Sequence, residues 1–133
     1  MANNWDARIK LLYPTDVGTF FTADTVVRDK AFDVIANVEV GKGIHQFTDA
    51  YTISVSVVNL SKSTLLAQKA DTDKLPPDET EYNAELRVNF PSGWAAKADV
   101  GDVLQAVASY TVAAGNQTDY STETSEMFLV VTK

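Results

Sequence analysis

The single histidine is the first side chain to consider for catalysis. His45 lies shortly before Asp49, and a Ser-His-Asp triad would use such a base and acid beside an activated serine. No Gly-x-Ser-x-Gly elbow accompanies them, so we expect His45 to be a solvated loop residue. With one histidine and no cysteine, a zinc site built from several His or Cys ligands is strongly disfavoured.

Carboxylates offer two further kinds of chemistry. Asp71 and Asp73, with Asp78 and Glu79 nearby, could supply oxygen ligands to calcium. Their spacing does not match an EF-hand, and acids in a proline-rich stretch are more often turn formers, so calcium stays an alternative.

A glycosidase would need two facing carboxylates. Glu81 and Glu85 share the wet face of one expected strand beside Arg87, where charge balance explains them. No phosphate-binding glycine motif is present. We therefore predict a protein that is not an enzyme, with no catalytic residue, no cofactor and no metal ligand.

Aromatic residues in connecting segments indicate a carbohydrate site as the alternative function. Trp94 follows a Pro-Ser-Gly turn, and Tyr120 lies beside Asn116, Gln117 and Asp119 in an expected protruding loop. A sugar stacks on an exposed ring while amides and carboxylates hydrogen-bond its hydroxyls. A ring buried under a loop is the competing interpretation, and it is favoured for Trp94.

The last two expected strands carry apolar residues on both faces. Val103 and Val107 lie opposite the main apolar face of their strand, and Met127, Leu129 and Val131 lie opposite that of the last strand. An open sheet with one wet face does not need this pattern. Something should therefore cover these five residues, which we predict to be an interface.

Three covers are possible for this second face. The first is internal, formed by the segments around residues 7–14 or 18–21 folding across it. The second is a copy of the same chain, and the third is a different protein. The internal cover is favoured over either of the other two.

Alternating hydrophobicity specifies the elements that would hold these residues. In residues 82–90 and 32–40, apolar and polar side chains take turns along the chain, as in half-buried strands. Glycine and proline punctuate the segments between them. The expected strands are 8–13, 18–27, 31–41, 50–60, 63–69, 80–90, 102–113 and 124–132.

This pattern predicts one all-β domain over residues 1–133, an antiparallel β-sandwich of seven or eight strands, with a barrel as the second choice. The layout resembles the immunoglobulin-like or fibronectin-III-like class in strand number and in its long final hairpin. The resemblance concerns architecture alone, and the chain has no cysteine pair.

Composition limits the kinds of partner. A net charge of −7 over 133 residues opposes binding to nucleic acid and to anionic membrane surfaces. The longest apolar run, 127–131, is too short for membrane insertion. The first ten residues show no signal peptide. We expect a soluble acidic protein, cytoplasmic or released without a visible signal, whose location the sequence leaves unknown.

These observations favour a non-catalytic binding or assembly module. It would act through a protein–protein interface, including one between copies of the same chain. The alternative is a lectin-like carbohydrate-binding domain that uses the loop aromatics.

Overall fold

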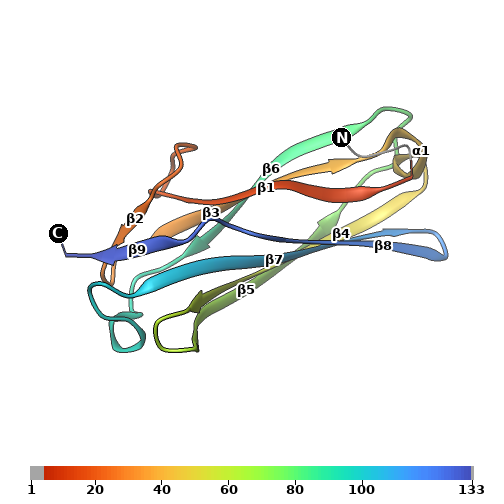
Figure 1. Cartoon of the computed structure of the whole chain (residues 1–133). Helices are drawn as coiled ribbons and strands as arrows, with labels where there is room; N and C mark the ends of the chain where they lie inside the picture. The colour runs from red at the N-terminus through yellow and green to blue at the C-terminus, as the bar shows by residue number, and fades with distance from the viewer. Residues whose placement is uncertain (1–4, 133) are drawn as a thin grey trace.

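The computed structural model describes residues 5–132, which form two packed β-sheets (Figure 1). A single helical turn, α1 (Lys42–His45), and a short 3-10 turn, η1 (Ala95–Lys97), connect strands. The strands are β1 (Ala7–Thr15), β2 (Thr25–Val27), β3 (Phe32–Val40), β4 (Thr48–Asn59), β5 (Thr64–Lys74), β6 (Tyr82–Phe90), β7 (Val103–Ala114), β8 (Gln117–Thr124) and β9 (Phe128–Val131).

The first sheet has the order β1-β3-β6, and both of its pairs are antiparallel. The second sheet has the order β2-β9-β7-β4-β5, and β8 also pairs with β7. Since β4 occupies one edge of β7 along nearly its whole length, β8 and β9 follow each other along the opposite edge. Apart from the three-residue edge strand β2, the second sheet therefore presents four columns of strands: β8 and β9 together, then β7, β4 and β5.

Alternation along the strands builds the core between the sheets. Successive strand residues face opposite sides, so the odd residues of β4 and the even residues of β7 lie inside, among them Val55, Val57 and Tyr110. The Phe32 ring contributes from the first sheet and packs against the rings of Phe90 and Phe128. The predicted all-β sandwich is confirmed.

The number and direction of the strands differ from the prediction. Residues 5–132 contain nine strands rather than seven or eight. β2 runs parallel to β9, so the sandwich is not purely antiparallel. Only Thr25–Val27 of the expected strand 18–27 is extended, because Asp16–Thr19 closes a turn and Gly18 adopts a positive φ of 82°.

Two segments that were expected to be irregular belong to strands. β5 continues to Lys74, so Asp71 and Asp73 lie on a strand opposite Ile53 and Tyr51. The expected protruding loop is mostly strand β8, joined to β7 by a tight turn at Gly115, whose φ is +61°. Within residues 5–132, no helix is long and apolar enough to span a membrane.

Candidate interaction surface

The five predicted interface residues lie at one end of the second sheet. Val103 on β7 pairs with Leu129 on β9, and Val107 follows four residues along β7, on the same face. Leu129 is 39% exposed, Val107 is 37% exposed and Met127 is 63% exposed. Val103 and Val131 are partly buried. These side chains therefore reach the solvent in the described structure.

The two N-terminal segments do not supply the internal cover that the sequence allowed. Residues 7–15 form β1, which pairs with β3 in the opposite sheet. Phe20 packs over the guanidinium of Arg87, 4.4 Å from ring centroid to Cζ, on that opposite sheet, and Phe21 is 82% exposed. The register therefore leaves the outer surface of the second sheet uncovered by either segment.

The whole outer surface of the second sheet is almost free of charge. The outward residues are those that alternate with the buried ones and pair with each other across the strands. We call them the uncharged face, and only Lys74, at one corner, carries a charge. They are Leu129 and Val131 of β9; Thr118, Tyr120, Thr122 and Thr124 of β8; Val103, Gln105, Val107, Ser109, Thr111 and Ala113 of β7; Ala50, Thr52, Ser54, Ser56 and Val58 of β4; and Leu65, Gln68, Ala70, Thr72 and Lys74 of β5.

The outer surface of the first sheet has the opposite character. Its outward residues include the charged side chains of Arg8, Asp33, Glu39, Glu85 and Arg87. Arg87 forms an ion pair of 2.7 Å with Asp33. The chain has 11 Lys and Arg and 18 Asp and Glu residues, and among the outward residues of the two sheets the charged ones lie almost entirely on the first sheet.

Two carboxyls on the charged side do face each other. Glu81 hydrogen-bonds with the nearly buried Glu39, and this contact with a second carboxyl raises the pKa of Glu81. Glycosidases hold their two carboxyls about 5 to 9.5 Å apart to fit a sugar and a water between them. Carboxyls in hydrogen-bond contact are too close for that reaction.

The residues of the predicted ligand loop lie in separate parts of the structure. Trp94 is only 4% exposed. Its Nε1–H donates to the Lys30 carbonyl over 3.0 Å, and its ring meets Phe32 edge to face. The indole therefore belongs to the core and offers no free face for stacking.

Asp119 and Tyr120 point to opposite sides of β8. Tyr120 is 71% exposed and lies on the uncharged face beside Thr111. Asp119 faces inward, where its Oδ2 accepts a hydrogen bond of 2.6 Å from the Ala7 N–H. The Ser121 hydroxyl accepts a similar bond of 3.0 Å from the Ile9 N–H. These two side chains join the edge of β1 to the second sheet.

Asn116 and Gln117 lie beside two aromatic residues that are distant from them in the sequence. With Trp5, Ile44 and Phe47 they line a pocket of about 340 Å³ at the end of the sandwich that holds α1. The Trp5 and Phe47 rings are nearly parallel, with centroids 6.4 Å apart, and both are more than half exposed. The sequence does not indicate that these residues lie together, because only the fold brings residue 5 to the β7–β8 turn.

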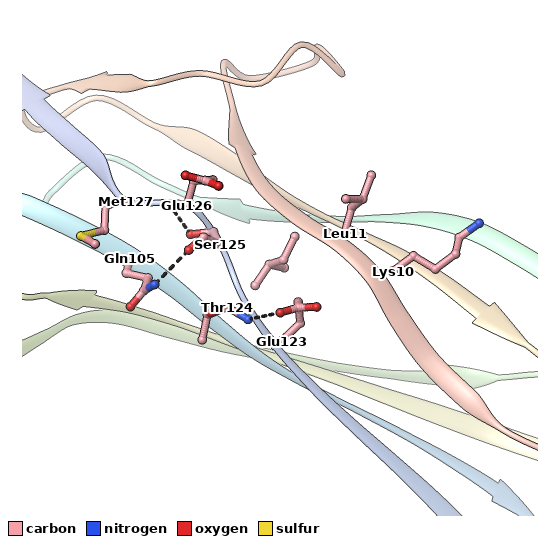
Figure 2. A pocket seen from close by; sticks show the side chains of 9 residues that line it. Lys10, Leu11, Gln105, Glu123, Thr124, Ser125, Glu126 and Met127 are labelled. Atoms are coloured by element: carbon pink, nitrogen blue, oxygen red, sulfur yellow. Dashed lines mark hydrogen bonds between the residues drawn. The ribbon is translucent and has the colours of Figure 1, made fainter. Parts of the chain in front are cut away.

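A larger pocket of about 410 Å³ lies between β1 and the link from β8 to β9. Figure 2 shows Lys10 and Leu11 on β1, across from residues 123–127. Buried Ser125 holds the link: its hydroxyl accepts from the Ala106 N–H, and its carbonyl accepts from Gln105. These bonds continue the attachment to β7 where β8 ends, so the polar groups of Ser125 serve the fold.

The remaining candidates for chemistry are placed as follows. We expected His45 to be solvated, but it is buried because α1 turns it inward. Its Nδ1 lies 2.6 Å from the Thr80 carbonyl, and its ring contacts Tyr82. Asp71 and Asp73 are exposed on β5. In the part of the chain that the structure describes, no three His, Cys, Asp or Glu side chains gather as a metal site would require.

Comparisons with known proteins assign no family, since no protein-family model and no curated protein matches the chain. The functional argument therefore depends on the geometry of this chain.

Proposed function

We propose that this chain is a non-catalytic assembly module that binds protein through the uncharged face. The observation that carries the proposal is the sorting of charge between the two sheets. Depletion of charged residues marks the cores of protein interfaces, whereas a solvated sheet face ordinarily carries charged residues. Here Arg8, Glu85 and Arg87 lie on one outer surface and only Lys74 lies on the other.

The apolar end of the uncharged face adds a driving force. Leu129 and Val107 are each more than a third exposed, so covering either one contributes about 1–2 kcal/mol before the costs of association. The rest of the surface is Ser, Thr and Ala, whose short side chains let another surface approach closely. Affinity would come from extended contact rather than from one deep anchor.

A photo-crosslinking residue in place of Ser109, near the middle of β7, tests this proposal. The matched control places the same residue at Asn37, on the outer surface of the first sheet. We expect a discrete protein adduct from position 109 in cells that make the protein, identified by mass spectrometry and abolished by adding Ser56→Lys. Equal adducts from both positions, or none from position 109, would contradict the proposal.

A second candidate function is carbohydrate binding at the Trp5–Phe47 pocket. Two exposed rings beside the amides of Asn116 and Gln117 combine the apolar and hydrogen-bonding surfaces that saccharides take. Because Trp94 is buried, a fluorescence change on adding oligosaccharides would report on Trp5. It should disappear in Phe47→Ala, and a glycan array without any binder would remove this candidate.

The immunoglobulin-like or fibronectin-III-like resemblance is part of the same proposal. It is supported by the first sheet, which takes β1, β3 and β6, and by β4, β7 and β9 in the other sheet. β5 departs from the constant-type pattern, because it pairs with β4 rather than joining the first sheet. Many binding modules use this architecture, so it is compatible with the proposal and does not carry it.

A further inference from the structure

We infer that the occupant of the uncharged face is a second copy of this chain, packed face to face in a two-fold dimer. The inference rests on the proposed function and names the partner for the same surface. Three properties of the surface carry it: its charge, its area and the position of its apolar end.

Charge is the first argument. Each copy carries a net charge of −7, so most approaches between two copies are repulsive. Stacked sheets lie about 10 Å apart, so the charged outer surfaces of two copies joined by their uncharged faces lie roughly 30 Å apart. That distance exceeds the Debye length of about 8 Å at physiological salt. Docking by the uncharged face thus brings together two acidic copies with little repulsion, whereas a basic partner would be better held by the charged surface.

Area is the second argument. β4 and β7 are each 12 residues long, and the four columns stand about 4.8 Å apart with about 3.4 Å per residue. The face therefore covers roughly 800 Å², which matches the surface that each partner contributes to an interface of standard size. A copy of the same sheet has the extent needed to cover it.

The apolar end fixes the direction of the two-fold axis. Val103 and Leu129 occupy this end on β7 and β9, and Val58 pairs with Leu65 at the same end on β4 and β5. An axis parallel to the strands, between β4 and β7, reverses the order of the columns. It keeps the apolar ends of the two protomers together: Gln105 of one protomer faces Val58 of the partner subunit, and Val103 and Leu129 lie one outward position further along. The other two-fold orientation, with the axis across the strands, would place this end against the opposite end of the face, where Ala50, Ala113 and the charged Lys74 lie.

The same axis makes a prediction about two serines in the middle of the face. Ser54 and Ser109 are direct cross-strand neighbours, on β4 and β7. In the dimer, Ser54 of one protomer faces Ser109 of the partner subunit, and the two-fold axis repeats this contact with the protomers exchanged. Both residues are outward and at least partly exposed, so substitutions there leave the core intact.

Sedimentation equilibrium with charge-swap variants tests the inference. We expect the wild-type protein to reach twice its 14.5 kDa monomer mass at micromolar to tens of micromolar concentration. Ser54→Lys and Ser109→Glu should each raise the dissociation constant at least about 30-fold, because each buries an unpaired charge. An equimolar mixture of the two variants should restore dimer, because the introduced lysine then faces the introduced glutamate. Asn37→Lys is the control and should dimerise like the wild type.

Each outcome has a defined meaning. A monomer at 200 µM, or a wild-type dimer that neither variant weakens, overturns the inference. The same holds if both variants are folded by thermal melting and their mixture stays monomeric. If position 109 crosslinks to a different protein while the chain is monomeric, the proposed function stands and the second copy is the wrong partner. If position 109 gives no adduct at all, both fail.

Discussion

Asp33 is a buried carboxylate on the outward side of β3, with an exposed fraction of 1%. Desolvation by burial raises the pKa of this carboxyl, but hydrogen bonds from the Gly18 N–H, the Asn89 amide and the Arg87 guanidinium together hold it below its ordinary value. One carboxylate on β3 thus ties the 16–19 turn to the neighbouring strand β6.

This arrangement predicts a pH-dependent stability at the scale of one residue. Asp33→Asn should lower the free energy of unfolding at neutral pH by about 2 kcal/mol, because hydrogen bonds to an ionised group are lost. The folded-state pKa lies below the unfolded value of 3.8, so the carboxylate's contribution is complete above pH 3.8. It disappears as the pH falls through the folded-state pKa.

Urea unfolding of both proteins from pH 7 to pH 2 measures the difference. The gap between the two curves should close below pH 3.8, and a gap independent of pH would show that the charge of Asp33 is not what stabilises the turn. Asn37→Asp adds a carboxyl on the same strand without these donors and serves as the control.

For some single residues, the sequence did not predict the surroundings of the side chain. The spacing of Asp119 and Tyr120 suggested one ligand loop, and only their positions on β8 separate them to opposite sides of a sheet. Burial was the favoured interpretation for Trp94, but the sequence could not show that its indole N–H donates to the Lys30 carbonyl. Both outcomes depend on tertiary contacts far away in sequence.

At the scale of elements, the edge of β1 is joined to the second sheet by side chains instead of a backbone ladder. Asp119 and Ser121 accept bonds from alternate amides of β1, those of Ala7 and Ile9. We expect the double variant Asp119→Ala, Ser121→Ala to speed amide hydrogen exchange at these two positions by about fivefold or more, since each lost bond contributes about 1 kcal/mol or more.

Exchange at β3 and β7 should change much less in this variant, because their ladders are intact. Thr118→Ala and Thr122→Ala, which alter the outward side of the same strand, are the matched control. Unchanged exchange at Ala7 and Ile9 would mean that the backbone of β1 is held by packing alone.

Most elements follow from alternation, and the exceptions have a physical explanation. β3, β4, β6 and β7 carry one apolar face each, so their period of two is visible in the sequence. β8 has no apolar face: its inward residues are Asp119, Ser121 and Glu123. A strand of this kind is specified by its neighbour and by a glycine turn, and its own hydrophobicity gives no signal.

At the scale of the whole molecule, net charge should control the proposed dimer. Two copies that each carry −7 repel at long range even when the contact surface is uncharged. Raising sodium chloride from about 20 mM to about 200 mM should therefore lower the dimer dissociation constant by roughly threefold or more. Sedimentation at both salt concentrations measures this, and an interface held by ion pairs would show the opposite trend.

The uncharged face was only partly foreseeable from the sequence. Four of the five predicted apolar residues, Val103, Val107, Leu129 and Val131, belong to it, and their presence on the wet side of two strands was the signal. The remaining Ser, Thr and Ala positions are ordinary within any one strand. Their significance comes from the register, which aligns Ser54 with Ser109 and Ala70 so that no charge interrupts the sheet.

The parallel pair of β2 and β9 has a consequence for how the chain bears mechanical load. β1 begins at one end of the sandwich and β9 finishes at the other (Figure 1). Tension along the long axis would slide β9 past β2 and β7 in shear. Strands loaded in shear must break their hydrogen bonds together, unlike a hairpin that unzips one rung at a time. Because these bonds share the load, we expect the sandwich to resist tension between its two ends better than a hairpin that is peeled apart.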